Sequence, residues 1–489
     1  MKKETIIEAI DIIKRLNSLS SGFNVYIVGG FLRDVLLKRV NKHSDIDLVV
    51  KKKVLNYSEK IACKFKSKFV ILNDINKTYR IMLKNSSIKN IDVSLLNGKT
   101  IEQDLQNRDF TINAIAINIK DLKDLKDLKN LNIYAPFGAL NDYILKIINT
   151  TSVKSFEIDP LRMLRAFRLA AELGFTISKE TFKQIRYYAK FINGVAPERI
   201  KNEFSRILST KKSTDFIKKM DKCELISEIF DEIKVMKKVD KKYYYHSNGL
   251  FQHSFETMKF VEKILNNLKK YFPDNYLNLN EHFNNNNVFS ENVTRKGLLK
   301  LAALFHDNAK PETSKFISGK IHFFGHEKLG AKKIKKIMQS IKFSKKDINI
   351  VSFLIENHMR LSGLTKNGSI TKNAILRFFR DIGDNIPDIF ILSMSDWYSY
   401  KRLKIFPSIV LKSQEKSVRK LMKYYYELKN KKPTLKIIDG NIIMKKFSLK
   451  QGPFIGKILN LVFEAQQNGE VSNTNEALEL ISSKLKFDN

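Results

Sequence analysis

The chain has 489 residues, of which 43% are apolar, so it can bury sizeable cores, and three or four domains are expected; no apolar run is long enough for a membrane span, which needs about 18 residues. Only Cys63 and Cys223 occur, which excludes a disulfide framework or a thiolate metal site and fits a cytoplasmic protein. The net charge of +37 favours a polyanionic partner such as RNA or DNA, although a general lysine- and asparagine-rich composition would explain the charge equally well.

The first 19 residues are basic, but they contain no continuous apolar stretch of the kind found in a signal peptide. Their isoleucines recur at helical spacing, so this segment predicts an amphipathic helix.

The stretch 25–50 predicts a strand, a tight turn, a helix and a second strand. Its first four residues, VYIV, form an apolar run without a polar break, as in a buried strand. Gly29 and Gly30 then allow a sharp turn and a close approach to a ligand. The helix is expected to begin near Phe31 and to carry Arg33 in its first turn.

Asp45 and Asp47 lie on the second strand of this stretch, two residues apart. Strand side chains alternate, so both carboxylates are expected on one face, with Ile46 in the core. Two adjacent carboxylates repel each other unless a cation lies between them. The pair therefore predicts a site for Mg²⁺ and a nucleoside triphosphate, and the alternative is an ordinary acidic pair at a solvated strand end.

The pattern GG-x-x-RD followed by D-x-D resembles the nucleotidyltransferase superfamily. In the GG-x-x-RD form it is similar to the branch that contains tRNA nucleotidyltransferases (CCA-adding enzymes) and bacterial poly(A) polymerases. The resemblance implies that Asp45 and Asp47 are catalytic and hold Mg²⁺, and that Gly29, Gly30 and Arg33 position the triphosphate.

A third acid, Asp92, lies in a candidate strand at Ile88–Leu96. The resemblance favours a third catalytic carboxylate here, and a structural role at a strand end is the alternative. The string RDFTINA that follows is similar to the family motif RRDFTxNA, with Asn107 in place of the first arginine. It implies that Arg108 binds phosphate and that Asn113 contacts the nucleotide.

After about residue 150 the pattern becomes helical, and Asp159 is expected near the start of a helix that carries Arg162, Arg165 and Arg168. The string resembles the family's EDxxR motif, with Ile158 in place of the glutamate. There, the Asp and the first Arg hydrogen-bond to the edge of the incoming base, which implies base selection by Asp159 and Arg162. The later arginines would neutralise phosphate charge. A basic surface helix is the alternative.

Candidate metal ligands follow between 246 and 400, and two of them, His306 and Asp307, come directly after an apolar helical run. Buried together, they need a compensating charge such as a metal ion. The order H…HD…D resembles the HD phosphohydrolase domain, which implies the ligands His253, His306, Asp307 and Asp396, with His326 and His358 as candidates for completing a two-metal site. The alternative is a domain retained for RNA binding or packing.

Three further segments are predicted to lie at the surface. Residues 121–131 read as a surface insertion, and the Asn-rich segment 274–293 as an exposed loop. In the basic segment 409–432, the tyrosines at 424–426 could contact RNA, and a solvated surface helix is the alternative.

The predicted fold class is α+β: a nucleotidyltransferase α/β head (1–150), a helical neck that binds nucleotide and RNA (151–235), an HD domain (241–400) and a helical tail (401–489). The expected function is addition of C, C and A from CTP and ATP to the 3′ end of tRNA with Mg²⁺, and a second divalent metal is a candidate for the HD domain. Addition of A only, of CC only or of poly(A) remains open, as does a metal-dependent HD phosphodiesterase or phosphatase. No membrane partner is expected, and no oligomeric state is predicted.

Overall fold

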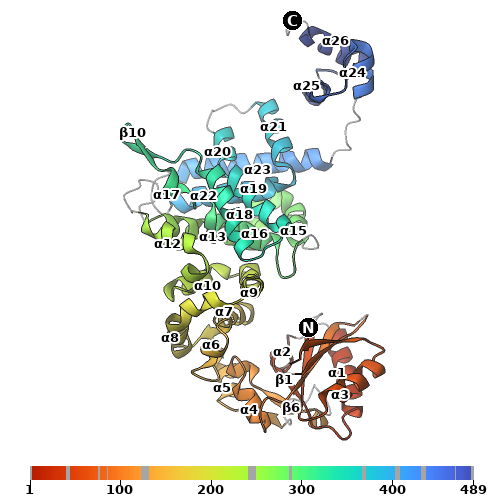
Figure 1. Ribbon diagram of the computed structural model, residues 1–489. Coiled ribbons are helices and arrows are strands. Elements are labelled where there is room, and N and C mark those ends of the chain that lie inside the picture. The colour runs from red at the N-terminus through yellow and green to blue at the C-terminus, as the bar shows by residue number, and fades with distance from the viewer. Residues whose placement is uncertain are drawn as a thin grey trace. The chain divides into compact units, whose positions relative to one another are not determined.

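In the computed structural model the chain folds into two compact units, Met1–Asp231 and Glu232–Asn489 (Figure 1). The described residues are 3–39, 44–74, 77–84, 86–122, 132–239, 249–285, 289–365, 371–401, 408–430, 437–468 and 470–485. From residue 123 on, the predicted surface insertion lies outside them. The boundaries of the four predicted domains stay predictions.

A seven-stranded sheet organises the first part of the first unit, in the order β3-β4-β5-β2-β1-β6-β7. The neighbours β2 and β5 are parallel, and the other neighbouring strands are antiparallel. The strands are β1 (Val25–Val28), β2 (Ser44–Val50), β3 (Phe69–Asn73), β4 (Thr78–Met82), β5 (Ile88–Leu95), β6 (Ala116–Asn118) and β7 (Ile133–Tyr134), followed later in the chain by the separate pair β8 (Ile147–Ile148) and β9 (Thr176–Ile177).

The two faces of the sheet differ in what covers them. Side chains such as Ile46 and Leu48 pack with the helices α1 (Lys3–Ser18) and α3 (Val54–Lys64) in the main core. Val49, on the opposite face, belongs to a smaller cluster with residues of α4 (Ile101–Gln106). Alternation places Asp45 and Asp47 on this second face, away from the main core. The predicted amphipathic N-terminal helix is thus confirmed as α1.

Apart from the short strand pair β8–β9, the rest of the first unit is helical. The predicted helix at Asp159 begins three residues later, as α7 (Arg162–Leu173), because Asp159 is in an extended conformation after α6 (Ser155–Ile158). The remaining helices are α2 (Gly30–Leu36), α5 (Ala139–Leu145), α8 (Lys179–Tyr188), α9 (Pro197–Ser209), α10 (Ser213–Lys222), α11 (Leu225–Ile229) and α12 (Asp231–Lys238), which spans the boundary of the units.

The second unit is almost entirely helical and carries one small hairpin, β10 (Lys315–Ile317) and β11 (Lys320–His322). Its helices are α13 (Leu250–Asn266), α14 (Leu268–Tyr271), α15 (Tyr276–Asn284), α16 (Arg295–Phe305), α17 (Lys310–Thr313), α18 (His326–Ser340), α19 (Lys345–Asn357), α20 (Arg360–Thr365), α21 (Lys372–Ile382), α22 (Ile386–Lys401), α23 (Ser408–Asn430), α24 (Gly440–Phe447), α25 (Pro453–Asn468) and α26 (Thr474–Leu485). The predicted α+β class is confirmed.

Two surface predictions in this unit are wrong over part of their residues. Residues 276–284 of the Asn-rich segment form α15, because Leu279 and Phe283, four residues apart, are both buried on one helix face. Residues 289–293 are irregular, as predicted. In α23, Tyr425 and Tyr426 are buried, and the Tyr425 ring contacts the Phe379 ring edge-on. These tyrosines pack inside the unit because they continue an apolar helical stripe, so they offer no exposed rings to RNA.

Among the residues that the structure describes, none of the helices has the length and apolar character that crossing a membrane would require.

Candidate active sites

Three carboxylates lie side by side at the centre of the sheet. Asp45 and Asp47 are both on β2, and Ile46 between them is fully buried on the opposite face. In the parallel pairing of β2 with β5, Asp47 is directly opposite Asp92. The Asn90 side-chain amide donates a hydrogen bond to Asp45 Oδ1 at 2.9 Å. The structure therefore brings together the three acids that the sequence analysis singled out.

This arrangement makes the carboxylates difficult to ionise. Burial, and to a smaller extent the charges of Asp92 and Asp45, raise the pKa of Asp47 to about 6, although the Arg108 guanidinium acts to lower it. Burial likewise raises the pKa of Asp45. A cation placed among these oxygens would relieve both the repulsion and the loss of hydration, and carboxylate oxygens are ligands that Mg²⁺ prefers. The residues present thus fit a divalent cation.

Asp92 is held by an arginine that the sequence analysis did not single out. Arg80, on β4, donates two hydrogen bonds to the Asp92 carboxylate, from Nε at 2.8 Å and from Nη2 at 2.7 Å. The signal in the sequence was a charged residue inside the apolar strand segment TYRIM. This clamp orients Asp92 beside Asp47, and it is compatible with both a catalytic and a structural role.

Gly29 brings the turn after β1 close to the acids. It has a φ of 75°, and a Cβ there would lie 3.0 Å from Arg108 Nη1 and 3.3 Å from Asp47 Oδ2. Any side chain would therefore be strained by the backbone and would meet both groups. Arg108 is further held by Asp104, whose Oδ2 accepts from Nη2 at 3.1 Å. A cationic guanidinium thus stands beside the acidic cluster, at the glycine turn.

A buried hydrogen-bond network connects α2 with α7. Arg33 Nη1 donates to the Asn113 side-chain oxygen at 2.7 Å, and the Asn113 amide nitrogen donates to Asp109 Oδ1 at 2.9 Å. Arg165 Nε donates to Asp109 Oδ2 at 2.8 Å. Burial acts to raise the pKa of Asp109, but Arg165 and Asn113 outweigh it and lower the pKa to about 2. Asn113 uses both ends of its amide here, so it orients Arg33.

Asp159 and Arg162 face the same region through different partners. Arg162 donates to the backbone carbonyls of Asn107, at 2.8 Å, and Arg108, at 3.3 Å. Asp159 accepts from Arg199 Nη2, on α9, at 2.8 Å. Arg162 is therefore tied to the segment that carries Arg108, which places the two predicted nucleotide-binding motifs next to each other.

Arg168, in contrast, is engaged inside the protein. Its Nε donates to Glu203 at 2.5 Å and its Nη1 to Glu172 at 2.9 Å, and its side chain is buried. These contacts support a structural role on α7.

We expect Arg168→Met to lower the free energy of unfolding by about 3 kcal/mol, because it leaves the Glu203 carboxylate buried without its cation. Urea unfolding followed by circular dichroism measures the effect. The matched control is Arg186→Met, since Arg186 is exposed and lies 4.0 Å from Glu224; its effect should stay within about 0.5 kcal/mol. Equal stability of the two variants would contradict the structural role of Arg168.

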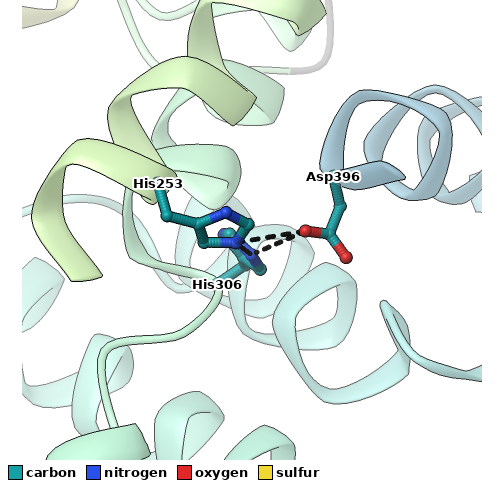
Figure 2. A group of neighbouring side chains, drawn as sticks. All are labelled: His253, His306 and Asp396. Carbon is teal, nitrogen blue, oxygen red and sulfur yellow. Dashed lines mark hydrogen bonds and ion pairs between the residues drawn. The ribbon is translucent and has the colours of Figure 1, made fainter. Parts of the chain in front are cut away.

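A second cluster lies in the core of the second unit. His253 on α13, His306 after α16 and Asp396 on α22 converge, with His253 Nε2 3.3 Å from His306 Nε2 and 3.1 Å from Asp396 Oδ1 (Figure 2). On the other side, His326 Nε2 lies 3.4 Å from His358 Nε2. All four histidines are buried.

Asp307 lies between the two halves of this cluster. Its Oδ2 is 3.3 Å from His253 Nε2 and 3.2 Å from His306 Nε2. Its Oδ1 is 3.3 Å from His326 Nε2 and 3.7 Å from His358 Nε2. One carboxylate thus faces two groups of candidate ligand atoms, one oxygen to each, so Asp307 would be available to a divalent cation held by either group.

Hydrogen bonds at Nδ1 orient the histidine rings so that each Nε2 faces the centre of the cluster. The Nδ1 atoms lie 2.9 Å from the Ala303 carbonyl for His306, 2.7 Å from Phe323 for His326 and 2.6 Å from Ile355 for His358. His253 Nδ1 lies 3.0 Å from the Ser399 hydroxyl. A carbonyl only accepts, so Nδ1 carries a proton in the first three, and Nε2 is the nitrogen that faces the centre, as in metal-ligating histidines.

The charges of the cluster favour a cation. Burial acts against an imidazolium, but Asp307 and Asp396 outweigh it and raise the pKa of His306 to about 10. Burial and the nearby His306 lower the pKa of His358 to about 3. Lys310 Nζ also lies 2.7 Å from Asp307 Oδ2. The acids therefore hold positive charge at the centre, and a divalent cation would displace the His306 proton.

Comparison with known proteins places three families along the chain. The Poly A polymerase head domain matches residues 25–133, the family described as "Probable RNA and SrmB- binding site of polymerase A" matches 174–237, and the HD domain matches 250–386. The resemblance of the chain to tRNA nucleotidyltransferases and bacterial poly(A) polymerases, with an HD domain, is thereby confirmed.

Similar proteins cover most of the chain. A CC-adding tRNA nucleotidyltransferase of Synechocystis is 25% identical over 92% of this chain and 91% of its own length. An A-adding tRNA nucleotidyltransferase of Deinococcus radiodurans is 24% identical over 77% of this chain and 78% of its own. The solved structure of the Thermotoga maritima CCA-adding enzyme with tRNA has a TM-score of 0.64 and 21% identity, and covers 97% of this chain and 95% of that one. This last likeness concerns the fold.

Proposed function

We propose that this chain, which carries a poly(A) polymerase head domain followed by an HD domain, is a tRNA nucleotidyltransferase that adds C, C and A from CTP and ATP to the 3′ end of tRNA. The observation that carries the proposal is the cluster of Asp45, Asp47 and Asp92 beside Gly29 and Arg108. Relatives named for CC, A and CCA addition support the substrate class.

In the head, Asp45 and Asp47, with Asp92 beside them, would hold Mg²⁺, which when bound activates the RNA 3′-hydroxyl and stabilises charge on the α-phosphate. The hydroxyl loses its proton to solvent while its oxygen forms a bond to the α-phosphorus, and the bond from that phosphorus to the bridging oxygen of the β-phosphate breaks, so pyrophosphate leaves. Arg108 lies beside this site and neutralises phosphate charge. Gly29, followed by Gly30, leaves room for the triphosphate because a side chain there would fill the space next to Asp47.

Arg33 would also bind the triphosphate, and its hydrogen bond to Asn113 positions it. Asn113 is in turn bonded to Asp109, which Arg165 holds in place. Asp159 and Arg162 select the base: an acceptor and a donor on a fixed scaffold can recognise the edges of cytosine and adenine. For base contact, Asp159 must exchange its partner Arg199 for the nucleotide, which this ion pair, open to solvent, allows.

Incorporation of labelled CTP and ATP, separately and together, tests the proposal on tRNAs that end before CCA, after C and after CC. Ordered addition of C, C and A that then stops is the expected result. Addition of CC alone, or of A onto the CC end alone, would narrow the function to one half of the reaction. Long A tracts would indicate a poly(A) polymerase, and no incorporation would overturn the proposal.

The clamp on Asp92 allows its role to be tested. If Asp92 is catalytic, we expect Asp92→Asn to reduce transfer about 100-fold or more, whereas Arg80→Met should cost about tenfold or less, since it only releases the carboxylate. Single-turnover transfer of labelled CTP measures both. Equal losses in the two variants would mean that the Asp92–Arg80 pair is structural.

A second activity is favoured by the position of Asp307 between two groups of histidines. We propose that His253, His306, Asp307 and Asp396, with His326 and His358, would hold two divalent cations, which when bound generate a nucleophilic hydroxide and stabilise a phosphate ester. The second unit would then be a metal-dependent phosphodiesterase or phosphatase that acts on nucleotides or RNA ends. Hydrolysis of RNA that ends in a 2′,3′-cyclic phosphate tests it.

A further inference from the structure

The hairpin β10–β11 lies in the chain between two residues of the second cluster, Asp307 and His326. It projects from the helices of the second unit (Figure 1). Ser318 and Gly319 form its tip, both with positive φ. A two-stranded hairpin of this size buries little by itself, so its side chains are available to a ligand.

The register of the hairpin separates its side chains into two faces. Lys315 is opposite His322, and Ile317 is opposite Lys320, so these four side chains share one face. Phe324 continues the same face, because its ring is stacked on the His322 ring with a centroid distance of 5.2 Å and an angle of 6°.

The opposite face carries Phe316, paired with Ile321. We call the first face, with Lys315, Ile317, Lys320, His322 and Phe324, the basic–aromatic face, because Ile317 is its one member that is neither basic nor aromatic.

The chemistry of this face matches single-stranded nucleic acid. The Phe324 side chain is 68% exposed, and both lysines are exposed. Aromatic rings beside cations are the groups on which unpaired bases stack while phosphates are neutralised. The stacked His322 ring holds the Phe324 ring in place, which lowers the entropy lost when a base binds.

The base of the hairpin is connected directly to the candidate metal site. Phe324 precedes His326 by two residues, so their Cα atoms lie within about 7 Å of each other. The Phe323 carbonyl accepts from His326 Nδ1 at 2.7 Å. Lys310 Nζ lies 5.3 Å from the centroid of the Phe323 ring and contacts Asp307. A base on Phe324 therefore places its own phosphate near the metal-binding side chains.

We propose that the basic–aromatic face binds the single-stranded 3′ end of RNA, with a base stacked on Phe324, and so makes the HD site selective for phosphate esters that carry a nucleobase. The inference rests on the hydrolase function proposed above. It names the substrate class of that site and assigns the hairpin as its specificity element.

Two substrates with the same reacting group test this in the full chain. One is a short RNA that ends in a 2′,3′-cyclic phosphate, and the other is glycerol 1,2-cyclic phosphate, which has the same cyclic ester and no base. We expect Phe324→Ala to raise KM for the RNA about tenfold, because one stacking contact is lost. KM for glycerol 1,2-cyclic phosphate should stay unchanged, since this substrate has no base to stack.

The matched control is Phe316→Ala, on the opposite face of the same hairpin and 75% exposed. It should change neither KM. Equal losses on both substrates in Phe324→Ala, or equal effects of the two substitutions on the RNA, would overturn the proposal, because each would mean that the hairpin acts without recognising a base.

Photocrosslinking separates failure of this inference from failure of the hydrolase. An RNA with a 3′-terminal 4-thiouridine, mixed with the metal-free chain, should crosslink to residues 315–324, and Phe324→Ala but not Phe316→Ala should reduce the yield. Crosslinks without hydrolysis of either substrate would support RNA binding by the basic–aromatic face and contradict the proposed hydrolase activity. Absence of crosslinks in this segment would overturn the inference.

Discussion

Asp47→Asn is expected to reduce nucleotidyl transfer about 1,000-fold or more while tRNA binding stays largely unchanged. The amide keeps the shape of the side chain but cannot carry a negative charge. In the unaltered chain, burial raises the pKa of Asp47 to about 6, so its carboxylate is already difficult to ionise without a cation. Without that charge the site loses most of its attraction for a divalent cation, and metal-assisted charge stabilisation contributes several kcal/mol to such reactions. Single-turnover transfer of labelled CTP at saturating tRNA measures the loss, and filter binding measures tRNA affinity.

A matched control for this substitution is Asp11→Asn, which alters an exposed carboxylate paired with Arg15 on α1. It should leave transfer within about twofold, as expected for a surface ion pair. If Asp47→Asn transferred nucleotides at the rate of the control, the assignment of the head as the transferase site would be wrong. Recovery of activity at high Mg²⁺ would show that Asp47 acts mainly through metal affinity.

The sequence was sufficient to predict that Asp45 and Asp47 lie together, because the geometry of this pair is local. Asp45 and Asp47 share a face by the alternation of a single strand, and Gly29 follows directly from an apolar strand. Asp92 could be expected nearby only from the resemblance to a family, since the pairing of β2 with β5 joins residues 45 positions apart.

Contacts between distant elements were beyond this kind of reasoning. Arg80 reaches Asp92 because β4 lies next to β5, and Asn113 meets Arg33 across 80 residues of chain. The spacing of Arg162, Arg165 and Arg168 on one helix said nothing about which of them would be buried. In the structure, Arg168 is buried in an ion pair with Glu203, because α7 packs against α9 at that point.

The loop predicted for the Asn-rich segment was based on its composition, and the periodicity of its apolar residues would have indicated a helix. The asparagines of α15 suggested a loop, yet Leu279 and Phe283 supply the buried face of a helix. The order of the HD ligands could be predicted, but the division of the cluster around Asp307 could not. It depends on α13, α16, α18, α19 and α22 converging at one point.

His306→Ala is expected to abolish hydrolysis of a 2′,3′-cyclic phosphate, by about 1,000-fold or more, and to leave nucleotidyl transfer unchanged. It removes a ligand from the half of the cluster shared with His253 and Asp396, and leaves Asp307 and Asp396 without the imidazole that balances their charge. Without His306 this half would hold a divalent cation less tightly, and the hydroxide that a bound cation would supply would be lost. Hydrolysis of a labelled cyclic-phosphate RNA, and metal content by mass spectrometry, measure the two effects.

The control is His282→Ala, which removes a histidine of the same unit that contacts Asp388 at 2.8 Å. Metal content and hydrolysis should match those of the unaltered chain, so any loss in His306→Ala is specific to the cluster. Chelation alone cannot make this distinction, because it would also remove any divalent cation held by Asp45 and Asp47 in the head. The reciprocal variant completes the argument: Asp47→Asn should hydrolyse normally. If either variant lost both activities, the two metal sites would not be independent, and the assignment of separate reactions to the two units would fail.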